Sequence, residues 1–162
     1  MKLAKFANIA LALALTSGVA FAKNEVVVST QKAAGTKVVA GIDFVSDGKV
    51  AAFDFDLMVP GLDVKSVNLA NCASELPKGF RGWCNAVQDK IVVLVVGDGL
   101  EDVLPAGVVP VGKISFSVRS SNMRKLSNAD VTEADGPISV GRVSVSDGVG
   151  KSSQATGKAL AE

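Results

Sequence analysis

A regular alternation of apolar and polar residues between positions 49 and 59 constrains the fold more than any other feature. Successive side chains of a β-strand point to opposite faces, so a period of two is the pattern of a strand that buries one face. The buried face is predicted to carry Phe53, Phe55, Leu57 and Val59, and the other face Asp54, Asp56 and Met58. We expect the second face to meet solvent or a partner.

Further short runs rich in β-branched residues are separated by Gly, Asp, Asn and Pro, which is typical of an all-β chain. Residues 90–96 are apolar at every position except the first and predict a central strand covered on both faces. Residues 71–88 are predicted to be irregular. The other expected strands are 25–29 at a sheet edge, 37–44, 62–69 anchored by Val64 and Val67, 109–118, 126–131 and 138–145. About nine strands in one domain predict an antiparallel jelly-roll sandwich over residues 24–146.

The two ends of the chain are predicted to lie outside this domain. Residues 1–22 have the pattern of a secretory signal peptide: a start made basic by Lys2 and Lys5, a short apolar run, and a cleavage site after Ala22. The apolar run is too short to span a bilayer, so we expect a secreted or periplasmic protein with no membrane span after cleavage. Residues 147–162 are rich in Gly, Ser, Lys and Ala, and they predict a disordered tail.

The cysteine content and the missing residue types limit the chemistry. Cys72 and Cys84 are the only two cysteines, and in an oxidising compartment they are expected to form a disulfide. The chain has no His and no Tyr, which argues against His-dependent nucleophilic catalysis and His-bearing metal sites. The 17 basic and 16 acidic residues nearly balance, so no nucleic-acid partner is expected. We therefore expect a protein that is not an enzyme.

Several segments, taken in order, resemble cohesin domains. Residues 48–57 followed by 62–67 are similar to the early cohesin strands, and residues 90–99 to the central strand and its acidic loop. Residues 107–118 and 126–131 are similar to two later segments of that family. The resemblance implies a jelly-roll sandwich that binds a dockerin, a helical calcium-containing module, through one flat sheet face. The Cys72–Cys84 loop is not a usual cohesin feature.

The resemblance and the alternation together select a partner-binding face, and two other functions remain open. The expected partner-binding residues are Asp54, Asp56, Met58, Asp98 and Glu101. A dockerin-type partner would suit a role in polysaccharide degradation or cell-surface assembly. The first alternative is a carbohydrate-binding module that uses Trp83, the only Trp, and Phe80. The second is a structural protein of the envelope or matrix. No cofactor or metal is expected, with calcium at the acidic turns left open.

Overall fold

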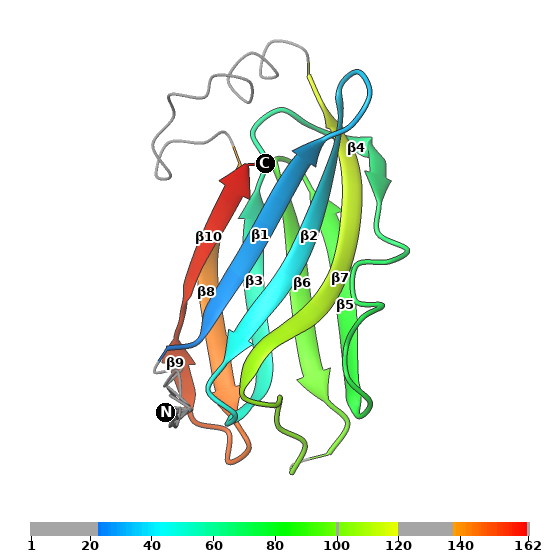
Figure 1. Cartoon of the computed structure of the whole chain (residues 1–162). Helices are drawn as coiled ribbons and strands as arrows, with labels where there is room; N and C mark the ends of the chain where they lie inside the picture. The colour runs from blue at the N-terminus through cyan, green and yellow to red at the C-terminus, as the bar shows by residue number, and fades with distance from the viewer. Residues whose placement is uncertain (1–22, 100, 120–137, 162) are drawn as a thin grey trace, which may run out of the picture.

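The protein is a sandwich of two five-stranded sheets in a computed structural model that describes residues 23–99, 101–119 and 138–161. Sheet A has the order β10-β1-β2-β7-β4 and sheet B the order β5-β6-β3-β8-β9, and the two form separate layers in Figure 1. The strands of sheet A are β1 (Glu25–Lys32), β2 (Lys37–Ser46), β4 (Leu62–Asn68), β7 (Gly107–Val118) and β10 (Thr156–Ala161). Those of sheet B are β3 (Val50–Met58), β5 (Phe80–Val87), β6 (Lys90–Gly97), β8 (Ser139–Asp147) and β9 (Ser152–Gln154). The predicted all-β sandwich is confirmed.

The core lies between the sheets and is built by the alternation read from the sequence. The four positions predicted to face inward from residues 49–59 are all buried, and so is every second residue of β2 from Val38 to Phe44. Phe44 of sheet A stacks on Phe53 of sheet B, with ring centroids 4.2 Å apart. Such a pair contributes about 0.5–1.5 kcal/mol beyond the burial of its area. The stack therefore helps to fix the two layers against each other.

The prediction of a disordered tail at 147–162 is wrong. β9 pairs with β8, and β10 pairs in parallel with β1, so β1 is an interior strand rather than the predicted edge strand. The inward positions of β10 carry only the small residues Gly157, Ala159 and Ala161, and a Cβ on Gly157 would lie 2.2 Å from Cγ1 of Val140. Small residues are needed at this closing edge because the two sheets approach each other there. Because these residues are only weakly hydrophobic, the sequence of β10 has the composition of a disordered tail.

Three other strand predictions need correction. The second half of the segment predicted to be irregular forms β5. Val64 is 41% exposed and does not anchor β4 in the core. β6 is buried on one face only, since Leu94 on its other face is 40% exposed. The predicted strand at 126–131 and the predicted signal peptide lie outside the described residues.

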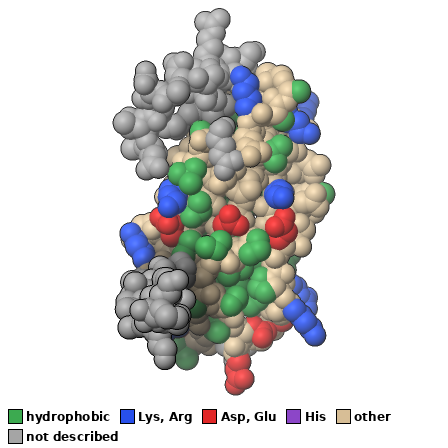
Figure 2. Space-filling model, viewed as in Figure 1, with side chains coloured by type: hydrophobic (Ala, Val, Ile, Leu, Met, Phe, Trp, Pro, Cys, Tyr) green, Lys and Arg blue, Asp and Glu red, His purple; other side chains and the backbone are tan. Residues whose placement is uncertain are grey.

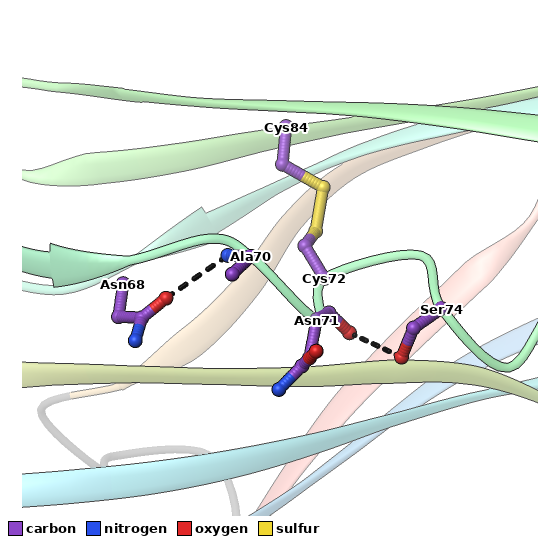
Figure 3. The surroundings of a disulfide bond; sticks show 6 residues. All are labelled: Asn68, Ala70, Asn71, Cys72, Ser74 and Cys84. Atoms are coloured by element: carbon purple, nitrogen blue, oxygen red, sulfur yellow. Dashed lines mark hydrogen bonds between the residues drawn. A yellow bond between two sulfur atoms is a disulfide. The ribbon is translucent and has the colours of Figure 1, made fainter.

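The predicted disulfide joins Cys72 to Cys84, with their Cα atoms 6.5 Å apart. It ties the crossover between β4 and β5 to the middle of β5, and so links the two layers at this side of the sandwich (Figure 3). The crossover is also held by its own turns, in which Asn68 Oδ1 accepts a hydrogen bond from the Ala70 amide. Ser74 Oγ donates another to the Asn71 carbonyl. The position of β5, an edge strand, therefore depends partly on this crosslink.

Candidate partner-binding face

The outer face of sheet B brings most of the predicted site residues together. Strand register places Trp83 of β5 opposite Leu94 of β6, Leu94 opposite Asp54 of β3, and Asp54 opposite Ser144 of β8. These four side chains form one row across the sheet, because they all sit at outward positions of their strands. The row starts with an aromatic residue at the edge strand and ends with polar residues.

The next rows extend an apolar strip along β5 and β6. Asn85, Val92 and Asp56 form the adjacent row. The row beyond it contains Val87 and Met58 on either side of Lys90, and both apolar side chains are exposed. Trp83 is 55% exposed and Leu94 40% exposed, so the strip is open to a partner along its length. Exposed apolar side chains gathered on one sheet face in this way are typical of an interaction site.

Asp54 is held by a cation from the neighbouring strand. Its Oδ2 accepts a hydrogen bond from Nη2 of Arg142 at 2.7 Å. Arg142 reaches Asp54 from β8 beside a bulge, where the register shifts between Phe55 and Leu57 of β3. Gly141 lies in this bulge, and a Cβ there would already be 3.4 Å from the Asp56 carbonyl oxygen. The bulge thus directs the arginine toward the carboxylate.

Asp56 has a separate cation. Its Oδ2 accepts a hydrogen bond from Nζ of Lys90 at 3.0 Å, and this pair is more buried than the Asp54–Arg142 pair. Exposed ion pairs contribute about 0–1 kcal/mol each to folding. Both ion pairs orient the carboxylates and offset their charge within the free protein.

The two loop residues predicted for this site differ in outcome. Asp98 lies at the rim, where its Oδ1 is 2.6 Å from Nε of Arg81, an outward residue of β5. In the turn after β6, the Gly99 amide donates a hydrogen bond to Oδ2 of Asp102 at 2.7 Å. Glu101 is exposed and has no hydrogen bond or ion pair with the rest of the described chain. Only Asp98 is therefore connected to the face by a contact.

The two aromatic residues considered for carbohydrate binding face opposite ways. Trp83 points outward into the apolar strip, whereas Phe80 is partly buried and packs against the core. A flat stacking platform for a polysaccharide needs several aromatic side chains in one plane. Trp83 is the only aromatic residue that the described part of sheet B presents on its outer face.

Sequence reasoning missed the cations and half of the apolar strip. Arg142 and Lys90 were not selected, since nothing in a single sequence pairs β3 with β8 and β6. Leu94 was missed because a run of apolar residues does not indicate which side of the strand is covered, and Val87 because it lies in the segment predicted to be irregular. Among the described residues, no three potential ligands come close enough to form a metal site, and no helix is long and apolar enough to cross a membrane.

Comparison with solved structures identifies the fold. No protein-family model matches the sequence, and no curated protein does either. The sixth cohesin of scaffoldin B from Acetivibrio cellulolyticus, solved with a Cel5 dockerin, matches with a TM-score of 0.54 and 14% identity, over 86% of this chain and 99% of that one. A type I cohesin from Clostridium thermocellum, solved in a cohesin–dockerin complex, matches at 0.51 and 18%, over 86% and 94%. A type II cohesin from Bacteroides cellulosolvens matches at 0.51 and 10%, over 85% and 99%.

These matches define the class to which the described chain corresponds. It is a cohesin-like β-sandwich, matched over nearly the whole length of each of the three cohesin modules. At identities of 18% or less the likeness concerns the fold, and the ligand has to be argued from the surface.

Proposed function

We propose that this protein is a non-catalytic binding module that docks a helical, dockerin-type protein on the outer face of sheet B. The observation that carries the proposal is the exposed apolar strip of Trp83, Leu94, Val87 and Met58 beside two oriented carboxylates. Interfaces of this type combine an apolar centre, enriched in Trp and Met, with a polar rim. The solved cohesins of the same fold include two that were crystallised with dockerins.

The face suits a partner helix that carries both apolar and polar groups. Covering Trp83 and Leu94 removes apolar area from water, at roughly 25 cal/mol for each Å². Asp54 and Asp56 are each bound to one cation and keep further lone pairs, so they accept hydrogen bonds from a partner without losing their ion pairs. Buried contacts to the strip supply affinity, while the carboxylates set the orientation of the partner.

The absence of catalysis is part of the proposal. Both cysteines are in the disulfide, and the whole chain has neither His nor Tyr. Asp54 and Asp56 are each paired with a cation instead of sharing a cleft with a second acid group. We further propose that any calcium required for binding belongs to the partner.

Export and biological setting are proposed from the sequence. A signal peptide cleaved after Ala22 would leave Lys23 as the first residue of a secreted or periplasmic module. That compartment is compatible with the disulfide. A dockerin-type partner would place the module in polysaccharide degradation or cell-surface assembly. Mass spectrometry of the intact protein recovered from the envelope or medium tests the cleavage site.

The experiment that tests the binding function uses purified dockerins of type I and type II together with insoluble polysaccharides. Binding of the oxidised protein to each is measured by calorimetry or by retention, with and without a calcium chelator. A dockerin that binds, and that binds the Trp83→Ala variant at least ten-fold more weakly, supports the proposal. Retention on a polysaccharide alone would assign Trp83 to sugar recognition instead. If no dockerin of either type binds, the proposal is overturned.

A further inference from the structure

The outer face of sheet A, on the opposite side of the sandwich, carries a second apolar surface. Figure 2 shows hydrophobic side chains gathered on this face among a few acidic and basic ones. They lie at outward positions of β10, β1, β2 and β7. The apolar members are Val27, Val39, Val45, Val108, Pro110 and Leu160, of which Val108 is 63% exposed.

Asp43 lies near the middle of this surface and has no partner of opposite charge among the described residues. Register places it between Val27 of β1 and Pro110 of β7. It makes no hydrogen bond or ion pair through its side chain with any described residue. Its environment therefore differs from that of Asp54 and Asp56, which each hold a cation. An unpaired carboxylate surrounded by apolar side chains is an incomplete site that a cation from another molecule would complete.

The same face carries the complementary features beside Asp43. Gly41 is the next outward residue of β2, and a Cβ there would meet only the Ser29 carbonyl oxygen, at 3.9 Å, so it leaves a shallow notch. Lys113 lies opposite Gly41 on β7, with its ammonium 3.7 Å from the Glu75 carboxylate. Both partners of that pair are largely exposed, so it is weak and exchangeable.

We propose that a second copy of this chain covers the face through a two-fold symmetric contact in which Asp43 of each copy pairs with Lys113 of the other. In such a contact the same patch meets itself. The two-fold axis would lie in the plane of the interface and run perpendicular to the strands. It would pass between the cross-strand row that contains Gly41 and the row that contains Asp43. Asp43 then enters the partner's Gly41 notch, and the partner's Lys113, about 5 Å away on the next strand, reaches it. The Lys113 stem would lie on Pro110.

The size and charge of the face favour this occupant. Five strands of about eight residues cover roughly 600 Å² in projection. A corrugated surface has more accessible area than its projection, so the face is comparable to the about 800 Å² that each partner buries in a standard interface. Lys158 is occupied by Glu25 within one copy, at 3.3 Å. Lys113 has a longer contact, 3.7 Å with Glu75, and lies opposite Gly41, one outward row from Asp43, so it is the cation best placed to form the cross-pair.

The contact has a functional consequence that goes beyond the proposed binding face. Sheet A and sheet B are opposite layers of one sandwich, so pairing through sheet A leaves both sheet B faces free and pointing away from each other (Figure 1). The dimer would be a bivalent adaptor. Two linked sites gain avidity for a partner that is itself repeated or fixed on a surface.

The experiment is a charge-exchange test by analytical ultracentrifugation of the oxidised protein. The wild type is expected to dimerise, and Asp43→Lys and Lys113→Asp to weaken the dimer at least ten-fold each, because each places like charges opposite one another. An equal mixture of the two variants is expected to restore dimers. In the mixed dimer the two introduced charges face each other with opposite sign, and the other cross-pair keeps the native Asp43 and Lys113. Removing the competing partner with Glu75→Gln is expected to strengthen the wild-type dimer.

The control is Lys49→Asp, which reverses an exposed charge in the turn between β2 and β3 and should leave the dimer unchanged. Thermal denaturation verifies that each variant is folded. A monomeric wild type at the highest soluble concentration overturns the proposal. So does a mixture that stays monomeric, or dimers that persist in both single variants. None of these outcomes depends on a dockerin, so this test and that of the proposed function fail separately.

Discussion

Trp83 and Leu94 lie directly opposite each other on β5 and β6, and both side chains point away from the core. A large aromatic residue and a leucine in one cross-strand pair stabilise a sheet modestly, by about 0.2–1 kcal/mol. In the free protein 55% of Trp83 and 40% of Leu94 remain exposed to water. The pair is therefore better suited to binding than to folding, and this distinction can be measured.

Trp83→Ala is expected to separate binding from stability. Central Trp side chains that become desolvated often cost about 2 kcal/mol or more when truncated, which is about 30-fold in affinity. Because Trp83 is more than half exposed, the free energy of unfolding is expected to change by no more than about 0.5–1 kcal/mol. Calorimetry with the dockerin found by screening measures the first quantity, and urea denaturation the second.

Val64→Ala is the matched control for this variant. Val64 is exposed to a similar degree as Leu94, but it lies on β4 at the edge of sheet A. Its truncation should leave partner binding unchanged. Equal losses of affinity in the Trp83 and Val64 variants would show that the strip on sheet B is not the binding surface.

The Asp54–Arg142 pair is expected to show a small, measurable coupling. A double-mutant cycle with Asp54→Ala and Arg142→Ala should give about 0.2–1 kcal/mol from denaturation curves, because the arginine is largely exposed. The coupling should fall at high salt. Asp54→Ala should also weaken partner binding more than Arg142→Ala does, since the carboxylate is the group proposed to accept the partner's hydrogen bonds. The reverse order would assign the polar contact to the arginine.

The sequence predicted the fold where a strand buries one face against water. The period-two pattern of β3 identified both its core residues and its outer carboxylates, because every second position differs in polarity. β6 lacked that contrast, and its exposed Leu94 could not be told from its buried neighbours. The alternation pattern therefore fails where a strand carries apolar residues on its exposed face as well as on its buried face.

Contacts between distant segments were the other limit. Arg142 reaches Asp54 across 88 positions of the chain, and β10 joins β1 from the opposite end of the described chain. Neither pairing has a local signal, and both depend on which strands the sandwich brings together. The disulfide was predictable because its two cysteines had no other candidate partners.

Removing the crosslink is expected to destabilise the protein without unfolding the core. Cys72→Ala with Cys84→Ala opens the closed loop, at a cost of about 2–4 kcal/mol. Because Cys84 is adjacent to Trp83 on an edge strand, hydrogen exchange should rise along β5 more than along β3. Urea denaturation and hydrogen-exchange mass spectrometry measure these effects. A uniform rise in exchange across both sheets would mean that the disulfide acts globally instead.

Gly157→Val tests whether the C-terminal strand belongs to the fold. A side chain on Gly157 would overlap Val140, since even a Cβ lies 2.2 Å from its Cγ1 atom, and overpacking of this kind typically costs about 1–3 kcal/mol. The neighbouring Lys158 points outward, so Lys158→Ala should lose only its exposed pair with Glu25, within about 0.5–1 kcal/mol. If β10 were detached in solution, both variants would leave the unfolding free energy unchanged. A loss confined to Gly157→Val means that β10 closes sheet A, and that deleting residues 152–161 would expose β1 as an edge.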